Sequence, residues 1–184
     1  MTRLVLLDRD GVINHDRPDS VKSPDELILL PGTAAAIARL NEAGVRVAVV
    51  TNQSVVGRNI ISMQMLERIH GELRSRLARE GAQLDTVLVC TDAPDRPSPR
   101  RKPQPGMLLE ALRLFRASAE ETPMIGDDLR DLQAAKAAGC RRVLVRTGKG
   151  AAVQAAGIAA DLLPVAVRAD LAAAVDSYLK GELL

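Results

Sequence analysis

Residues 4–14 read LVLLDRDGVIN, an apolar run that ends in two aspartates separated by one residue and followed by a glycine. Four consecutive apolar residues that lead into a polar turn are typical of a short buried β-strand. Asp8 and Asp10 would then lie at the carboxyl end of this strand, and Gly11 would let the backbone turn closely beside them. The stretch therefore predicts a buried strand that presents two carboxylates at one end.

Buried strands alternate with helices along the rest of the chain. Further strands are predicted at 45–50, 84–90, 123–126 and 143–145, with another near Leu162. Helices are predicted at 33–43, 62–80 and 105–117, between Asp128 and Gly139, and after Asp170. Alternation of this kind predicts an α/β fold, a Rossmann-like doubly wound parallel sheet with helices on both faces.

The length of the chain limits how many domains it can form. With 184 residues, we expect a single domain that spans residues 1–184. Only about 20 residues separate the first strand from its helix, and the loop after the third strand is shorter, so no cap domain is expected. The site should then be open to solvent, and no partner is needed as a lid, which favours a monomer.

Composition excludes several classes of protein. With 47% hydrophobic and 26% charged residues, wholesale disorder is excluded. A formal charge of +2 gives no global attraction to a polyanion, and Phe115 and Tyr178 are the only aromatic residues, which argues against base stacking. No segment resembles a signal peptide or approaches the ~20 apolar residues of a membrane helix. We therefore expect a cytoplasmic protein with neither a nucleic-acid nor a membrane partner.

Polar side chains gather at the carboxyl ends of the predicted strands, where open parallel sheets bind their ligands. Asp8 follows the first strand, Thr51 and Asn52 the second, and Asp127 the fourth, while the loop after the third delivers Lys102. A carboxylate nucleophile, a general acid, a lysine and a divalent cation are what hydrolysis of a phosphate monoester dianion requires. Mg²⁺ prefers such hard oxygen ligands. The pattern predicts a magnesium-dependent phosphatase.

Four motifs at these strand ends resemble those of the haloacid dehalogenase superfamily, in the same order and at similar separations. They are DRDGVIN at 8–14, TNQS at 51–54, RKP at 101–103 and GDD at 126–128. With RKPQPGML at 101–108 and VRTGK at 145–149, the chain resembles one branch of that superfamily, the heptose-1,7-bisphosphate 7-phosphatases and related histidinol-phosphatase domains. The resemblance covers roughly residues 3–150.

This resemblance implies an activity and a set of residue roles. The activity is Mg²⁺-dependent removal of the 7-phosphate of D-glycero-D-manno-heptose 1,7-bisphosphate through a phospho-aspartate, in the synthesis of the lipopolysaccharide precursor ADP-heptose. Asp8 would be the nucleophile, Asp10 the general acid and base, and Thr51 and Lys102 would stabilise the transferring phosphoryl group. The implied metal ligands are Asp8, the backbone carbonyl of Asp10, and Asp127. The implied substrate contacts are Asp16, Arg17, Pro18, Asp19, Asn52, Gln53, Ser54 and Arg101.

Two positions depart from the pattern of the family. Many members carry a zinc-binding loop before the third motif, but here only Cys90 matches a zinc ligand, Asp92 stands in place of a histidine, and no later cysteine pair follows. We therefore expect no zinc, and a proline-rich loop in its place. Asp128 stands where relatives often have lysine, which leaves its role open.

Alternative functions remain at this point. A receiver-type phospho-acceptor domain also combines an acidic pair, a hydroxyl and a lysine around Mg²⁺, but its acceptor aspartate lies at the end of a later strand, where this chain has Thr51-Asn52. Among phosphatases, histidinol phosphate or another small sugar phosphate is the main alternative substrate. The cluster Arg100-Arg101-Lys102 favours a doubly phosphorylated sugar, because guanidinium groups bind phosphate bidentately.

Overall fold

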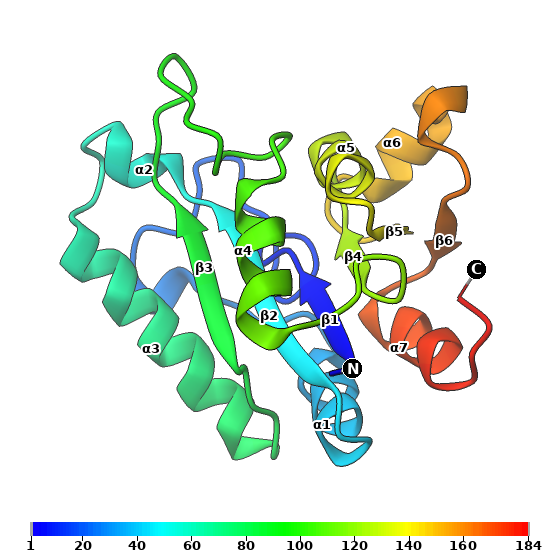
Figure 1. Cartoon of the computed structure of the whole chain (residues 1–184). Helices are drawn as coiled ribbons and strands as arrows, with labels where there is room; N and C mark the ends of the chain where they lie inside the picture. The colour runs from blue at the N-terminus through cyan, green and yellow to red at the C-terminus, as the bar shows by residue number, and fades with distance from the viewer. Residues whose placement is uncertain (1, 184) are drawn as a thin grey trace.

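A computed structural model describes residues 2–183 and contains a six-stranded, fully parallel sheet with strand order β3-β2-β1-β4-β5-β6 (Figure 1). The strands are β1 (Leu4–Leu7), β2 (Arg46–Asn52), β3 (Thr86–Cys90), β4 (Pro123–Gly126), β5 (Arg141–Val145) and β6 (Ala166–Arg168). The predicted fold class is therefore confirmed.

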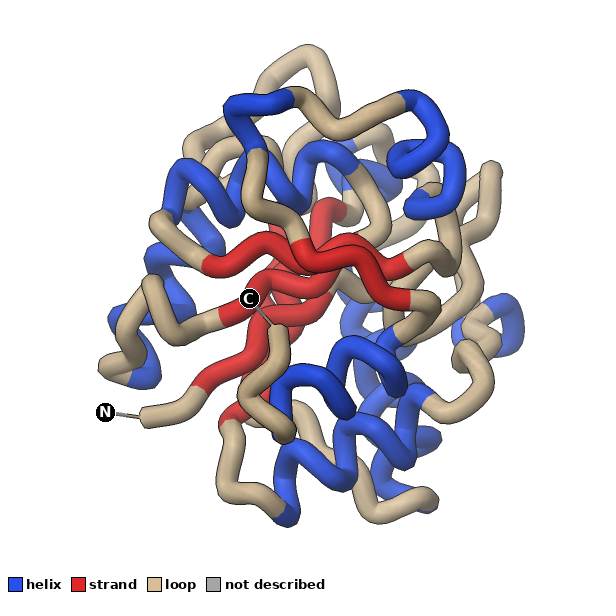
Figure 2. The backbone as a smooth tube through the Cα atoms, turned by 90° about the vertical axis from the view of Figure 1, so that its right-hand side faces the viewer, coloured by secondary structure: helices blue, strands red, loops and turns tan. Residues whose placement is uncertain are grey.

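Helices cover both faces of the sheet (Figure 2). They are α1 (Thr33–Glu42), α2 (Ser54–Gly57), α3 (Met63–Arg79), α4 (Gly106–Phe115), α5 (Leu129–Ala138), α6 (Gly150–Ala156) and α7 (Leu171–Leu179). Alternate residues of each strand point to opposite faces. Val5 and Leu7 accordingly pack in the core under α1, α3 and α7, whereas Leu4 and Leu6 pack in the core under α4 and α5.

The sheet changes winding direction at its centre. From β1 the chain proceeds outward through β2 to β3, then returns to place β4 on the other side of β1 and continues to β5 and β6. β1 and β4 are neighbours, with Leu7 paired to Ile125. A crevice outside the carboxyl ends of the strands is expected at such a reversal. Asp8 and Asp127 directly follow these two strands, so the topology brings them together.

Two loops at this edge take the place of a cap domain. The β1–α1 connection is irregular apart from single-residue bridges and a short 3-10 helix, Pro24–Glu26. The β3–α4 connection carries the proline-rich segment 91–104, which has no helix or strand. Neither forms a layer over the site, and the expected absence of a cap is confirmed.

The structure corrects the sequence-based assignment in the last third of the chain. The strand expected near Leu162 is a 3-10 helix, Ala160–Leu162, and the edge strand β6 lies a few residues later. The side chain of Leu162 is buried by packing against Leu132 and Leu144, so its apolar character did not indicate a strand. The short helix α2 also was not expected. No helix within residues 2–183 has both the length and the apolar character needed to cross a bilayer.

Candidate active site

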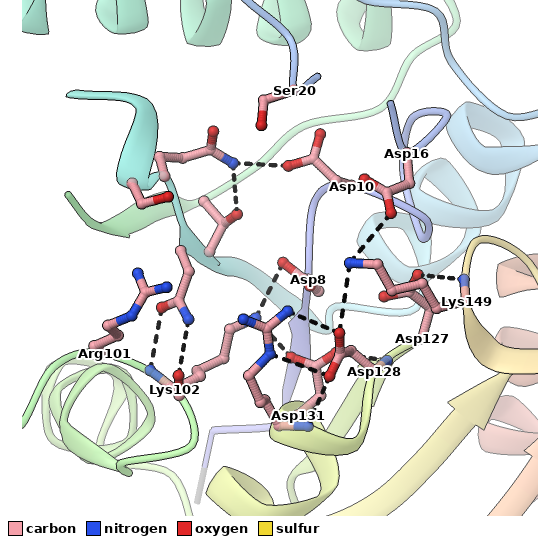
Figure 3. A pocket seen from close by; sticks show the side chains of 15 residues that line it. Asp8, Asp10, Asp16, Ser20, Arg101, Lys102, Asp127, Asp128, Asp131 and Lys149 are labelled. Carbon is pink, nitrogen blue, oxygen red and sulfur yellow. Dashed lines mark hydrogen bonds and ion pairs between the residues drawn. The ribbon is translucent and has the colours of Figure 1, made fainter. Parts of the chain in front are cut away.

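Asp8, Lys102 and Asp131 form a buried ionic cluster at the centre of the crevice (Figure 3). Lys102 Nζ lies 3.0 Å from Asp8 Oδ1 and 2.6 Å from Asp131 Oδ1. The backbone N–H of Arg9 also donates to Asp8 Oδ1, at 2.7 Å. One oxygen of Asp8 is therefore fixed, while no hydrogen bond from residues 2–183 reaches the other, Oδ2. A fixed carboxylate with one free oxygen suits a nucleophile.

The carboxylate of Asp10 is held by four hydrogen bonds from side chains. Oδ1 accepts from Arg9 Nη2 at 2.9 Å and from Asn14 Nδ2 at 2.8 Å. Oδ2 accepts from Arg9 Nη2 at 3.0 Å and from Gln53 Nε2 at 2.7 Å. Gln53 Nε2 also donates to Thr51 Oγ1, at 3.0 Å. The second motif therefore orients the first, and Asp10 has one fixed position beside Asp8.

Asp8, Asp127 and Asp131 form a carboxylate cluster suited to a divalent cation. One oxygen from each lies within 4.8 Å of the other two, and among the described residues no other such group of three acidic, histidine or cysteine ligands occurs. Both oxygens of Asp131 already accept hydrogen bonds, from Lys102 and from the backbone N–H of Asp128. Oxygens of Asp8 and Asp127 are therefore the side-chain ligands best placed for Mg²⁺, which prefers carboxylate oxygen.

Two glycines leave room for the carboxylate of Asp127. Gly11 and Gly148 both have positive φ, of 79° and 55°, and a Cβ at either position would overlap Oδ2 of Asp127. The same oxygen accepts the backbone N–H of Lys149 at 2.8 Å. The loop after β5 and the turn after β1 thus enclose one side of Asp127 and leave Oδ1 for a cation. The donor set fits the magnesium ion that the sequence predicted.

The crowding of carboxylates is visible in their proton affinities. Burial, together with Asp131 and Asp10 and against the effect of Lys102, raises the pKa of Asp8 to about 6. Burial and the facing charge of Asp8 raise the pKa of Asp127 to about 8. Burial disfavours charge on Lys102 as well, but the charges of Asp131 and Asp8 outweigh it and raise its pKa. Asp8, Asp127 and Asp131 share the single positive charge of Lys102, so the site has an excess of negative charge, which a divalent cation would offset.

Asn52 fixes the loop that carries Lys102. Its Nδ2 donates to the carbonyl of Lys102 at 2.9 Å, and its Oδ1 accepts the backbone N–H of Lys102 at 3.1 Å. Arg101 is anchored in a similar way, since its Nη1 donates to the carbonyl of Asp92 at 2.9 Å. Asp92 Oδ2 in turn accepts the backbone N–H of Ser98. These contacts hold the proline-rich loop against the site. This loop stands where many family members have a zinc-binding loop, and the absence of zinc from this protein stays a prediction.

The cavity at this edge has a volume of about 150 Å³. Of the sequence-predicted site residues, those that line it are Asp8, Asp10, Asp16, Thr51, Asn52, Gln53, Ser54, Arg101, Lys102 and Asp127. Arg17, Pro18 and Asp19 lie outside this lining, and Arg17 forms ion pairs with Asp19 and Glu26. Substrate contacts by these three residues stay a prediction.

Several residues of the site were not singled out by the sequence analysis. Ser20, Arg130 and Lys149 line the cavity, and Arg9 lies beneath it with a fully buried side chain. Lys149 was noted only as part of VRTGK; its Nζ lies 3.3 Å from Asp16 and 3.5 Å from Asp128. The signal for Arg9 was its position between two site aspartates directly after a buried strand.

Comparison with known proteins gives consistent results. The sequence profile of the HAD-hydrolase-like family matches residues 99–174. A D-glycero-beta-D-manno-heptose-1,7-bisphosphate 7-phosphatase of Bordetella bronchiseptica is 42% identical over 97% of this chain and 98% of its own. A protein of the same name from Pseudomonas aeruginosa is 43% identical over 80% of this chain and 83% of its own.

The chain belongs to the heptose-1,7-bisphosphate 7-phosphatase family. Its fold also matches a crystal structure of D,D-heptose 1,7-bisphosphate phosphatase from B. bronchiseptica complexed with magnesium and phosphate, with a TM-score of 0.92, 41% identity and coverage of 98% of this chain and 99% of that one. The resemblance to haloacid dehalogenase-type phosphatases is therefore confirmed, and the chain is a phosphatase. That heptose-bisphosphate phosphatase was solved with magnesium, and the carboxylate cluster of this chain offers the oxygen ligands that such a cation prefers.

Proposed function

We propose that this heptose-1,7-bisphosphate 7-phosphatase family member removes the 7-phosphate of D-glycero-D-manno-heptose 1,7-bisphosphate, with Mg²⁺ and a phospho-aspartate on Asp8. The observation that carries this proposal is the convergence of Asp8, Lys102 and Asp127 in one cavity at the carboxyl edge of the sheet. The product would feed the synthesis of the lipopolysaccharide precursor ADP-heptose. Mg²⁺ held by Asp8, the Asp10 carbonyl and Asp127 would neutralise charge on the phosphoryl oxygens.

In the first half-reaction, an oxygen of Asp8 attacks phosphorus and the bond from phosphorus to the sugar oxygen breaks. Lys102 keeps its charge because two carboxylates flank it, so it can stabilise negative charge on the phosphoryl group. The hydroxyl of Thr51 lines the same cavity and adds a hydrogen bond. Asp10 donates a proton to the leaving alkoxide, since the arriving dianion raises its proton affinity.

In the second half-reaction, Asp10 acts as a base. It takes a proton from a water molecule, whose oxygen attacks phosphorus and breaks the acyl-phosphate bond, so that Asp8 and inorganic phosphate are released. Both roles need the Asp10 carboxylate to stay beside the bond that changes. Its four hydrogen bonds provide that fixed position.

Specificity would come from the loops that border the open cavity. Asp16 and Ser20 from the first loop and Arg101 from the proline-rich loop line it, and Arg101 is the cation assigned to substrate recognition. Arg17, Pro18 and Asp19 lie farther out, where they would contact substrate at the rim. Because the site is open and no partner is needed as a lid, the chain would act as a monomer.

A kinetic screen tests the proposal. Phosphate release is measured with Mg²⁺ for both anomers of heptose 1,7-bisphosphate, histidinol phosphate and simple sugar phosphates. We expect the highest kcat/KM for a heptose bisphosphate, and rapid quenching with mass spectrometry should trap a phosphorylated Asp8. Asp8→Asn should remove nearly all turnover while its thermal unfolding stays cooperative. Phosphate release close to that of the wild type by Asp8→Asn would rule out the nucleophile, and a preference for histidinol phosphate would overturn the substrate.

A further inference from the structure

We propose that His70 is a positioning residue for phosphate-ester cleavage, acting through Arg9 to hold Asp10 against the leaving group. The inference rests on the proposed function, because it assigns a role to the group that supports the general acid. His70 lies on α3, far along the chain from the catalytic motifs, and it does not line the cavity. Its effect on the reaction would therefore pass through a chain of hydrogen bonds.

The hydrogen bonds that lead from His70 through Arg9 to Asp10 are continuous and mostly buried. Nη1 of Arg9 lies 3.2 Å from Nε2 of His70, while Nη2 of Arg9 donates to both oxygens of Asp10 and to Oε1 of Gln53. The Arg9 side chain has no solvent exposure and His70 is 9% exposed. One planar guanidinium thus has one end on His70 and the other on the general acid, so a shift of His70 would rotate the donors that hold Asp10.

The direction of the His70 contact follows from elementary chemistry. A guanidinium can only donate hydrogen bonds, so Nε2 of His70 must be the acceptor, and His70 must be neutral with its proton on Nδ1. The surroundings agree, since burial and the charges of Arg9 and Arg74 lower the pKa of His70 to about 4. Asp10 is the other charge near His70, and it opposes this shift.

A purely structural role explains this arrangement less well. Burying a guanidinium is costly, and buried ion pairs are often no more stabilising than apolar residues of similar size. Leu66, Ile69, Leu73 and Leu77 form the rest of the buried face of α3, so an apolar residue at position 70 would suit packing alone. A neutral acceptor is needed there only because Arg9 is present, and Arg9 is aimed at Asp10.

The test separates general-acid positioning from folding by changing the leaving group. A sugar phosphate has a poor alkoxide leaving group and needs protonation, whereas 4-nitrophenyl phosphate has an acidic one and needs it little. We expect His70→Leu to lower kcat/KM, which covers only the first half-reaction, about tenfold for the sugar phosphate, a fraction of the ~10²–10⁴-fold that a general acid supplies, and less than about threefold for 4-nitrophenyl phosphate. Ile69→Val, a packing change at the neighbouring buried position, should leave the ratio of the two rates unchanged.

A pair of polar variants covers the case in which His70→Leu does not fold. The amide oxygen of His70→Gln reaches about as far as Nε2, whereas that of His70→Asn reaches only about as far as Nδ1. We expect His70→Gln to preserve the ratio of kcat/KM for the sugar phosphate to kcat/KM for 4-nitrophenyl phosphate. We expect His70→Asn to lower this ratio. Equal losses for both esters, no loss for either, or no difference between Gln and Asn would overturn the proposal.

Asp10→Asn distinguishes failure of this inference from failure of the proposed function. It should reduce kcat/KM for the sugar phosphate far more than kcat/KM for the aryl phosphate, because the second half-reaction, in which Asp10 acts as base for both esters, does not enter kcat/KM. If Asp10→Asn shows that selectivity and the His70 variants do not, the positioning role is wrong while the general acid stands. If Asp10→Asn shows no selectivity, the role of Asp10 itself is wrong.

Discussion

The carboxylate of Asp127 illustrates how single residues of this site depend on a cation. It is 2% exposed and faces Asp8, and Gly11 and Gly148 lie close against one of its oxygens. In the unfolded chain its pKa would be near the ordinary 3.8, whereas in the folded protein it is about 8. Because the folded state holds this proton more tightly, rising pH penalises folding between these two values.

This difference gives a prediction for Asp127→Asn. In the presence of a chelator, the variant should unfold a few degrees higher than the wild type at pH 8, and the gap should shrink towards pH 5, because asparagine cannot ionise. Adding Mg²⁺ should raise the unfolding temperature of the wild type but not that of the variant. Thermal melts over this pH range make the measurement. A variant less stable than the chelated wild type at pH 8 would contradict the account.

Gly11 allows a second test at the residue scale, with a matched control. Gly11 and Gly81 have nearly the same left-handed φ, 79° and 78°, but only a Cβ at Gly11 would meet Asp127, while at Gly81 nothing lies within 4 Å. Alanine at either position should cost about 1 kcal/mol of stability through backbone strain. We expect only Gly11→Ala to weaken Mg²⁺ binding, as measured by calorimetry, and to lower kcat/KM by at least about 100-fold. Equal Mg²⁺ affinity of the two variants would disprove the crowding argument.

At the scale of elements, α5 connects a helix cap with the catalytic lysine. The backbone N–H of Asp128 donates to Oδ2 of Asp131 at 3.1 Å, and Oδ1 of Asp128 accepts the backbone N–H of Arg130, so the helix begins with a reciprocal cap. The other oxygen of Asp131 binds Lys102. One side chain therefore both starts the helix and holds the lysine.

Two substitutions at Asp131 should separate these two tasks. Asp131→Asn keeps an oxygen for the cap but removes the charge beside Lys102 and turns its NH2 towards that lysine, so we expect lower kcat and lower stability, because a buried cation loses one of its two partners. Asp131→Ala loses both contacts and should have about 1 kcal/mol less unfolding free energy than Asp131→Asn, as expected for a missing N-terminal cap. Chemical denaturation and steady-state kinetics on the two variants make the comparison. Unchanged kcat in both would show that Lys102 does not depend on Asp131.

At the scale of the whole molecule, the site lies in an open crevice. The loops after β1 and β3 border the cavity without covering it, so no partner is needed as a lid. We therefore expect specific activity to stay constant from nanomolar to micromolar protein, and light scattering to give the mass of a monomer. Loss of activity on dilution, together with a dimer mass, would show that a second copy completes the site.

The sequence alone was enough to predict the order of strands β1 to β5 and of the helices α1, α3, α4, α5 and α7, and which residues follow the strands. These features are local: an apolar run followed by DRDG, or a strand followed by TNQ, carries its own signal because burial and turn chemistry act over a few residues. The boundaries of β1 and β4 were predicted correctly for this reason. The family resemblance supplied the heptose bisphosphate, which no local pattern encodes.

Only the tertiary structure decided how distant residues support one another. The contacts of Arg9 with His70, of Asn52 with the backbone of Lys102, and of Lys149 with Asp127 join segments that lie far apart in the chain. Edge strand β6 was misplaced because Leu162 is buried by a long-range contact with Leu132, not by sheet pairing. Such contacts depend on how the sheet is wound, and the spacing of residues along the chain does not determine them.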